Sequence, residues 1–348
     1  CVSATASELF KVPASGGAST ALSGTVVASA TGVEGFRLAP DGSRVVFHGK
    51  LSSATRLRLY STPLSGAATR TTLSDTASTM QIADINRYAI SPNSARAVYI
   101  MTELSTPGIG DYLYSVPIAG GASTLLNNTG NGLLGNINDW TIAPNSQRVL
   151  WLGTEPQIST ADQCDSVFSA PIAAANGRTK LAGDAQNRDG YSAWQLRVTP
   201  DSQTIVFSGT LSDPTLVTLY SVPVAGGATQ SLIGDGRVAS DVPSAGENDA
   251  GNERFREEFR LTQDGSRVIY RGDYPGAPFP EAQHSLWAVP VGGGSTLLLS
   301  GGYEVSKIVS FFGISQNPAN DIVTFRSRRS SPDNIELFVT SGVSTNRS

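Results

Sequence analysis

The amino-acid sequence predicts an all-β chain folded as a β-propeller of four-stranded antiparallel blades, and three observations support this prediction. A phrase of the type Leu-Tyr-Ser-Val-Pro-Val-Ala-Gly-Gly recurs seven times in the 348 residues, with copies that begin at Leu9, Leu59, Leu113, Val167, Leu219, Leu286 and Leu337. A second phrase, of the type Pro-Asp-Gly, precedes each copy from the second onward. The 36 glycines and 19 prolines suit many short strands joined by tight turns. Self-similarity at such a period is typical of a repeat architecture.

The first phrase has the composition of a β-hairpin. In the fifth copy, Leu219–Val222 alternates sides with period two and is rich in strand-forming residues. Pro223 cannot donate to a strand ladder, so it suits the end of the strand. Gly226 and Gly227 supply the positive φ of a tight connection. A second strand is expected at 228–233, which completes the hairpin.

The second phrase is the composition of a type I turn with a left-handed last residue. Its first copy is Ala39-Pro40-Asp41-Gly42, and the later copies begin at Ser91, Ala143, Thr199, Thr262 and, in degenerate form, Ser315. Serine replaces the last glycine at Ser94, Ser146 and Ser202, where mild backbone strain is expected. One unit therefore reads strand, Pro-Asp turn, strand, loop, strand, Gly-Gly turn, strand, which is one propeller blade.

The repeat covers nearly the whole chain, so we expect a single propeller domain over residues 1–348. It divides into an N-terminal half blade at 1–30, complete blades at 35–75, 86–128, 138–183, 194–234 and 257–300, and a last blade at 311–348 that lacks a fourth strand. We expect the N-terminal strand near Ser19–Leu22 to supply that strand and to close a ring of six blades. A ring of seven blades remains the alternative if the chain is a fragment.

The charge and the hydropathy pattern exclude two classes of partner. The net charge is −4, whereas a nucleic-acid-binding surface needs a basic footprint. No apolar run is long enough to span a bilayer, so no transmembrane segment is expected. The chain begins at Cys1, which is read either as the lipid-bearing cysteine of a bacterial lipoprotein or as the start of a truncated chain. Whether Cys1 forms a disulfide with Cys164 is left open.

Taken together, the two phrases resemble the TolB-like, WD-repeat-like propeller repeats of bacterial envelope proteins. Five segments carry the resemblance best: Ala39–Phe47, Leu113–Leu126, Thr199–Phe207, Leu219–Leu232 and Thr262–Tyr270. The resemblance implies a periplasmic or secreted protein-interaction platform. Related propellers also form the gating domain of prolyl-oligopeptidase-like hydrolases and the body of some polysaccharide lyases. The shared residues belong to turns and core, so the resemblance assigns no site residue.

No catalytic constellation is found. The nucleophile motif G-x-S-x-G does not occur, and the two histidines, His48 and His284, are too few for a zinc or manganese site and are expected on loops or at the rim. The acidic loop 235–258 lacks the ligand spacing of a calcium loop and is read as solvated, although calcium binding there is left open. We therefore expect no catalysis, no cofactor and no metal.

The remaining place for function is the mouth of the central channel, where the inner strand of each blade begins. Two positions there are polar in most blades and vary in chemistry between blades, which residues needed for packing would not do. They give the binding candidates Glu34, Asn86, Arg87, Asn138, Asp139, Trp194, Gln195, Glu257 and Glu258. The next position is large and apolar and is expected in the core: Phe36, Tyr88, Trp140, Leu196, Phe259 and Phe312.

These features predict a non-catalytic, extracytoplasmic, monomeric scaffold that binds a protein or peptide at its loop-bearing face. The carboxylates of Glu34, Asp139, Glu257 and Glu258 favour a cationic segment, which Arg87 opposes locally. One alternative is a carbohydrate-binding or polysaccharide-active propeller, in which Trp194, Tyr274 and Phe279 stack on sugar rings. Another is the propeller part of a larger prolyl-oligopeptidase-like hydrolase.

Overall fold

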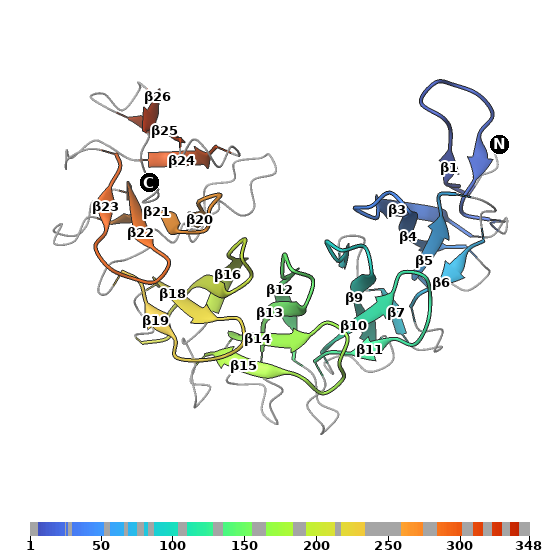
Figure 1. The fold of residues 1–348 in the computed structure, drawn as a ribbon, viewed down its shortest axis with the longest axis horizontal. Helices are drawn as coiled ribbons and strands as arrows, with labels where there is room; N and C mark the ends of the chain where they lie inside the picture. The colour runs from blue at the N-terminus through green and yellow to red at the C-terminus, as the bar shows by residue number, and fades with distance from the viewer. Residues whose placement is uncertain are drawn as a thin grey trace. The chain divides into compact units, whose positions relative to one another are not determined.

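The regular secondary structure of the described part of the chain is entirely β-strand (Figure 1). The computed structural model describes residues 6–24, 26, 30–51, 56–65, 69–74, 80–82, 87–103, 110–127, 135–154, 165–183, 193–212, 217–233, 259–273, 284–300, 309–315, 322–328 and 335–340. The chain divides into two compact units. Unit 1 comprises Cys1–Ile158 and Phe168–Thr179, and unit 2 comprises Ser159–Val167 and Lys180–Ser348. Each unit is described by itself.

In the described part of the chain the strands form seven sheets, an N-terminal hairpin and six blades. The hairpin is β1 (Phe10–Lys11) and β2 (Thr20–Ala21). Blade 1 is β3 (Gly32–Leu38), β4 (Arg44–Lys50), β5 (Arg58–Pro63) and β6 (Thr71–Thr72). Blade 2 is β7 (Met80–Ile82), β8 (Tyr88–Ile90), β9 (Arg96–Glu103), β10 (Asp111–Pro117) and β11 (Thr124–Leu125). Blade 3 is β12 (Ile137–Ile142), β13 (Arg148–Thr154), β14 (Asp165–Pro171) and β15 (Thr179–Ala182).

The other three blades repeat this plan. Blade 4 is β16 (Ala193–Val198), β17 (Thr204–Gly209), β18 (Thr218–Pro223) and β19 (Gln230–Ser231). Blade 5 is β20 (Phe259–Leu261), β21 (Arg267–Asp273), β22 (His284–Pro290) and β23 (Leu297–Leu298). Blade 6 is β24 (Val309–Ile314), β25 (Val323–Arg328) and β26 (Ile335–Thr340). Each blade follows chain order, except that β7 and β8 both pair with β9 in place of one inner strand.

The corners between strands are the two phrases seen in the sequence. Gly42, Gly226 and Gly227 have positive φ, and so do Ser94 (59°) and Ser146 (62°), as the turn chemistry predicts. The serine hydroxyls also join neighbouring blades, which the sequence did not suggest. Ser94 Oγ accepts a hydrogen bond of 3.0 Å from the backbone N–H of Asp41, and Ser146 Oγ accepts one of 3.0 Å from that of Asn93. These inter-blade bonds offset the strain of a left-handed serine.

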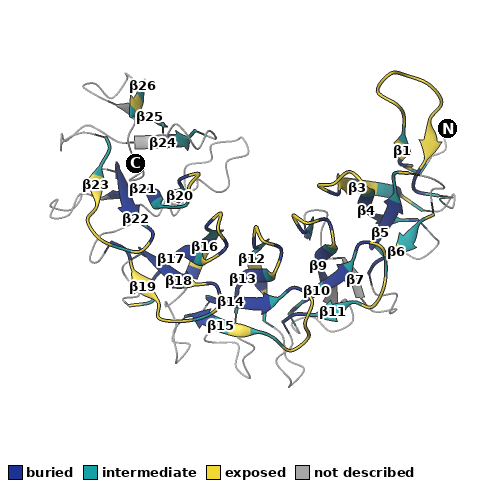
Figure 2. Ribbon diagram, viewed as in Figure 1, coloured by how far each residue is buried: buried dark blue, intermediate teal, exposed yellow. Residues whose placement is uncertain are grey.

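The cores lie between adjacent blades, which pack face to face within each unit (Figure 2). The middle strands are almost wholly buried because each contributes side chains to both of its faces. Between blades 1 and 2, Val46 and Leu59 pack with Tyr99 and Met101, and between blades 2 and 3, Val98 and Leu113 pack with Val149 and Trp151. Between blades 4 and 5, Val206 and Leu219 pack with Val268 and Val289, and between blades 5 and 6, Ile269 and Leu286 pack with Val323 and Phe325.

Among the described strands the N-terminal hairpin is a sheet of its own, which gives seven sheets; the sequence favoured a ring of six blades and kept seven as the alternative. It packs on blade 1 through Leu9 and Leu22, which contact Val45, Phe47 and Tyr60. Among the described strands, β2 pairs with β1 and β26 with β25. The predicted pairing of Ser19–Leu22 with the last blade is not among these pairs and stays a prediction, as does the single domain.

A polar residue just after the outer strand recurs at a position that neither phrase marks. Its side chain accepts a hydrogen bond from the N–H of the leucine that begins the hairpin phrase. The pairs are Leu9 with Ser23, Leu59 with Ser74, Leu113 with Asn127 and Leu286 with Ser300, at 3.0–3.1 Å. Asn127 also donates to the carbonyl of Asp111 at 2.7 Å, which fixes the start of β10. No helix in the described ranges is long and apolar enough to cross a lipid bilayer.

Candidate functional site

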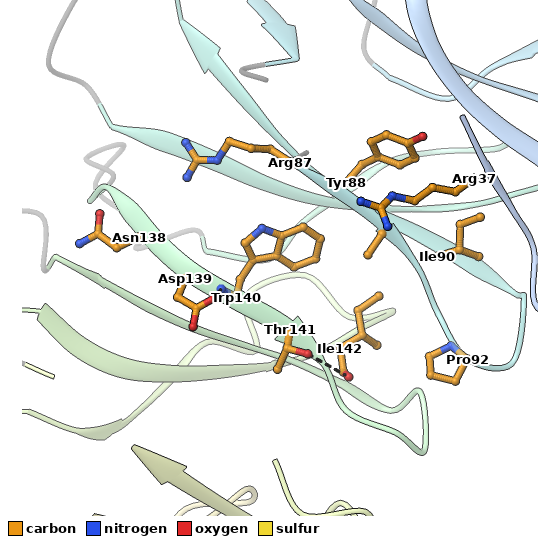
Figure 3. Close-up of a pocket in the computed structure, with 11 residues that line it drawn as sticks. Arg37, Arg87, Tyr88, Ile90, Pro92, Asn138, Asp139, Trp140, Thr141 and Ile142 are labelled. Atoms are coloured by element: carbon orange, nitrogen blue, oxygen red, sulfur yellow. Dashed lines mark hydrogen bonds between the residues drawn. The ribbon is translucent and has the colours of Figure 1, made fainter. Parts of the chain in front are cut away.

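A cavity of about 480 Å³ lies on the inner strands of blades 2 and 3 in unit 1. Its walls come from β8 and β12, and Arg37 of β3 reaches it from blade 1 (Figure 3). One end is polar, with Arg87, Asn138 and Asp139, and the other is apolar, with Ile90, Pro92 and Ile142. The volume is in the range of small-ligand and side-chain pockets, about 300–1,000 Å³.

Three of the predicted candidates, Arg87, Asn138 and Asp139, line this cavity. Their binding role stays a prediction. The position next along β12, Trp140, was assigned to the core, and this is confirmed only in part, because Trp140 packs against the core between blades 2 and 3 without being fully buried. Trp140 is half-buried and lines the cavity, whereas its equivalent in blade 2, Tyr88, is 2% exposed.

The core prediction is wrong for Phe36, the equivalent residue of blade 1, which is 57% exposed. The reason is how far its neighbour extends. The N-terminal segment covers Val45, Phe47 and Tyr60 of blade 1, but along β3 it contacts the beginning of the strand, at Gly32 and Val33, and Phe36 is not part of this cluster. The equivalent residues Leu196, Phe259 and Phe312 are buried, as predicted.

β-Bulges occur where the sequence placed the mouth of the channel. The strand register shifts between Val33 and Gly35, between Ile137 and Asp139, between Trp194 and Leu196, and between Val309 and Phe311. A bulge inserts one unpaired residue, bends the strand and re-aims the side chains beside it. The residues inserted are Glu34, Asn138, Gln195 and Ser310. In most blades the sequence has polar residues before the apolar core position, but this pattern did not predict a bulge.

In blade 3 the bulge depends on a glycine in the next strand. Gly153 of β13 pairs with Ile137, immediately before the bulge. A Cβ atom at this position would lie 2.3 Å from the carbonyl oxygen of Asn136, far inside van der Waals contact. The absence of a side chain therefore lets the bulged strand approach closely and positions Asn138 and Asp139.

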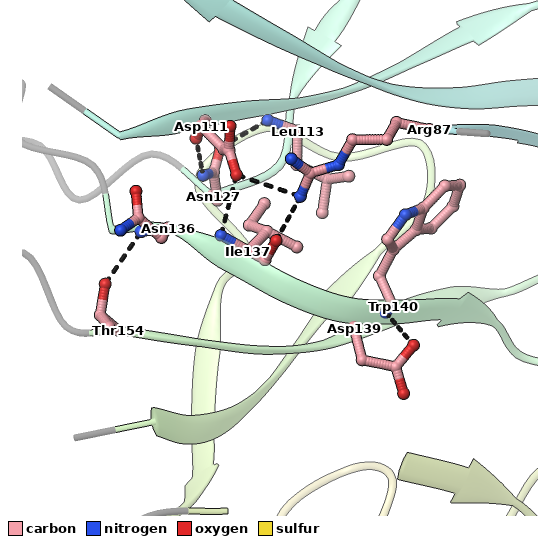
Figure 4. A network of polar contacts seen from close by, with 9 residues as sticks. All are labelled: Arg87, Asp111, Leu113, Asn127, Asn136, Ile137, Asp139, Trp140 and Thr154. Atoms are coloured by element: carbon pink, nitrogen blue, oxygen red, sulfur yellow. Dashed lines mark hydrogen bonds and ion pairs between the residues drawn. The ribbon is translucent and has the colours of Figure 1, made fainter. Parts of the chain in front are cut away.

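Arg87 lines the cavity, but its guanidinium joins blades 2 and 3 (Figure 4). Nη2 forms an ion pair of 3.1 Å with Oδ2 of Asp111 and donates to the carbonyl of Ile137. The same Oδ2 accepts a hydrogen bond of 3.0 Å from the N–H of Ile137. Asp111 is 8% exposed and was not singled out from the sequence, because it stands two residues before the hairpin phrase and outside both repeats.

The electrostatics of the cavity involve two further charged groups. The guanidinium carbon of Arg37 lies 5.4 Å from the centre of the Tyr88 ring. Burial raises the pKa of Tyr88 to about 12, and Arg37 opposes this shift, so the phenol is neutral at physiological pH. Asp139 Oδ1 accepts a hydrogen bond of 2.8 Å from the backbone N–H of Trp140, and its carboxylate and the indole point away from each other (Figure 4).

The other candidates do not gather at this cavity. Glu34 is exposed, and its Oε1 accepts a hydrogen bond of 3.1 Å from Thr31 Oγ1. Trp194, which is 40% exposed, and Gln195, with φ of 45°, belong to unit 2. The predictions for Cys1, Asn86, Cys164, the loop 235–258 with Glu257 and Glu258, Tyr274 and Phe279 lie outside the described residues.

The expectation of loop histidines is wrong for His48. It lies within β4, is 1% exposed and contacts the Tyr88 ring edge to face at 5.5 Å. His284 begins β22. The described part of the chain contains no group of three or more His, Cys, Asp or Glu residues that could hold a metal ion.

No protein-family model matches the chain, and no curated protein matches it. Inside each unit, however, four-stranded antiparallel sheets pack face to face in chain order, and this arrangement decides the fold class. The protein is a β-propeller. Among solved structures, the propeller is similar to prolyl oligopeptidase B from Galerina marginata bound to a 35mer hydrolysis and macrocyclization substrate, with a TM-score of 0.50 and 10% identity. The match covers 89% of this chain and 42% of that chain.

Two further solved structures are similar at comparable levels. The β-propeller domain of the Trilobed protease from Pyrococcus furiosus has a TM-score of 0.41 at 10% identity, covering 95% of this chain and 90% of that one. Oligogalacturonate lyase from Vibrio parahaemolyticus has a TM-score of 0.49 at 10% identity, covering 97% and 83%. The propeller spans half or less of the prolyl endopeptidase chains that it matches, at 50% and 42%. At such identities the similarity concerns the fold alone.

Proposed function

We propose that this propeller is a non-catalytic, extracytoplasmic scaffold that binds a protein or peptide segment at the ends of its inner strands, as TolB-like propellers do. The single observation that supports this proposal is the composition of the cavity on β8 and β12. An aromatic and aliphatic wall adjoins a polar end with one carboxylate and one amide, which suits a peptide side chain and its backbone. The protein acts as a monomer in this proposal.

The charges of the site favour a basic segment. Arg87 is already paired with Asp111, so the pair contributes no net charge to the cavity. The carboxylate of Asp139 lines the cavity, and the guanidinium of Arg37 lies against the Tyr88 ring. Opposite charge at a binding surface speeds association and selects the partner.

Titration of a lysine- and arginine-rich peptide against the wild type and an Asp139→Ala/Glu258→Ala double variant tests the proposal. Each exposed ion pair contributes up to about 1 kcal/mol, so we expect the double variant to bind about threefold to tenfold more weakly. The charge-matched control is Glu8→Ala, an exposed carboxylate on the N-terminal hairpin, which should leave the affinity unchanged. Equal affinity of the wild type and the double variant would remove these residues from the site.

One observation favours a second candidate function, binding of carbohydrate. Trp194 is an exposed aromatic residue beside a bulge of an inner strand in unit 2, and such rings stack on sugars. A glycan array followed by Trp194→Ala discriminates the two functions: a sugar that binds the wild type and not the variant would support the second. The propeller part of a larger prolyl-oligopeptidase-like hydrolase remains a third proposal.

A further inference from the structure

One position of the inner strand carries arginine in three blades and a small residue in the others. The strand pairing defines this position. In every blade, its residue stands opposite the residue at one and the same place in the middle strand. In chain order its residues are Arg37, Ala89, Thr141, Arg197, Arg260 and Gly313. It comes directly after the large core position that Tyr88 and Trp140 occupy in blades 2 and 3.

In blades 1 and 5 this arginine covers the ring at the core position of the next blade. The guanidinium carbon of Arg37 in blade 1 lies 5.4 Å from the ring centre of Tyr88 in blade 2. Independently, in unit 2, that of Arg260 in blade 5 lies 5.8 Å from the ring centre of Phe312 in blade 6. Both distances fall within the roughly 6 Å of a cation–π contact. Tyr88 and Phe312 are both buried.

Blade 2 has no arginine at this position. Ala89 stands at the arginine position, and the ring that an arginine there would cover is that of Trp140 in blade 3. Trp140 remains half-buried, and the cavity of about 480 Å³ is lined by both Ala89 and Trp140. Arg87 does not supply the missing group, because its guanidinium is directed to Asp111 and Ile137 (Figure 4). The cavity therefore lies beside the Trp140 ring, where the equivalent rings next to blades 1 and 5 are covered by a guanidinium.

We propose that this cavity is a socket for an arginine side chain of the bound partner, which lies over Trp140 as Arg37 lies over Tyr88. The proposal rests on the proposed function, because it names the side chain that the peptide inserts. Indole is the best aromatic partner for a cation, and Asp139, at the polar end of the cavity, offers a carboxylate to the planar fork. Asn138 adds an amide at the same end of the cavity.

The charges that oppose the proposal are those of the two arginines in the cavity wall. Arg87 is neutralised by Asp111, whereas Arg37 has no ion pair among the described residues. An acidic side chain bound to Arg37 is the competing occupant. We favour the cation because the cavity is lined by the indole of Trp140 and the carboxylate of Asp139, while the guanidinium of Arg37 already contacts the Tyr88 ring.

The test uses the full chain and three small probes: Nα-acetyl-arginine N-methylamide, its neutral citrulline analogue and the corresponding glutamate derivative. Binding is followed by tryptophan fluorescence, with Trp140→Phe to assign the signal. The decisive variant is Ala89→Arg, which fills the socket with an arginine at a position where blade 1 already carries one. Gln147→Arg, in the exposed turn after β12, adds the same charge elsewhere and is the matched control.

We expect the arginine probe to bind wild type and Gln147→Arg alike, and to bind Ala89→Arg at least about tenfold more weakly, as loss of one cation–π contact implies. Citrulline should bind about tenfold more weakly than arginine to the wild type, since it keeps the shape and loses the charge. Equal binding of the arginine probe to Ala89→Arg and wild type, or preferential binding of glutamate, would overturn the socket. If basic peptides still bind in that case, the proposed function stands. If no basic peptide binds the wild type, both fail.

Discussion

Replacement of Asp111 by alanine is expected to lower the free energy of unfolding by about 2–4 kcal/mol, because it leaves one half of a nearly buried ion pair without its partner. Asp111 Oδ2 accepts from both Arg87 and the N–H of Ile137, so the substitution orphans a guanidinium and a backbone donor at once. These bonds join blade 2 to blade 3 beside the cavity. Urea denaturation of wild type and variant measures the loss.

Two further variants separate this effect from a general loss of negative charge. Asp111→Asn keeps an acceptor for Ile137 and should recover part of the stability, whereas Glu8→Ala removes an exposed carboxylate and should change the free energy of unfolding by less than about 0.5 kcal/mol. A change as small in Asp111→Ala as in Glu8→Ala would show that the bond between the blades contributes nothing.

Gly153→Ala is expected to destabilise the protein by about 1–3 kcal/mol and to disturb the cavity at the same time. The new methyl would lie 2.3 Å from the carbonyl oxygen of Asn136, so either β12 or β13 must shift. Because the bulge of β12 follows at once, Asn138 and Asp139 should lose their positions. We therefore expect weaker binding of the arginine probe even under conditions in which the variant is folded.

The matched control is Gly292→Ala, since a Cβ at that glycine would have no atom within 4 Å. It should change neither stability nor binding. If Gly153→Ala retains wild-type affinity while being clearly less stable, then the bulge does not position the site, and the proposed role of Asn138 and Asp139 must be abandoned.

The sequence predicted the parts of the fold that depend on local turn chemistry. Proline, glycine and aspartate set φ at fixed places, so the strand corners followed from composition, including the left-handed Ser94 and Ser146. The exposure of Phe36 did not follow, because it depends on how much of blade 1 a two-stranded neighbour covers. Long-range packing of this kind leaves no trace in a local pattern.

The candidate site was predicted in part, for a similar reason. The varying polar positions located Arg87, Asn138 and Asp139 at the cavity. Asp111 was missed because its partner Arg87 is distant in the sequence, and Trp140 was assigned wholly to the core because the sequence did not show that it also lines a cavity. The signal for the socket was present as an irregularity in the repeat, alanine at a position where blades 1, 4 and 5 have arginine, and it became meaningful only once the register was known.

Photo-crosslinking tests the central claim most directly, namely that a basic peptide binds on the inner strands of blades 2 and 3. A basic peptide with a benzophenone beside its arginine is irradiated with the full chain, and the modified residues are mapped by mass spectrometry. The account predicts crosslinks within 87–92 and 138–142, lost in the presence of excess arginine probe. Crosslinks confined to other parts of the chain, or undiminished by the probe, would contradict it.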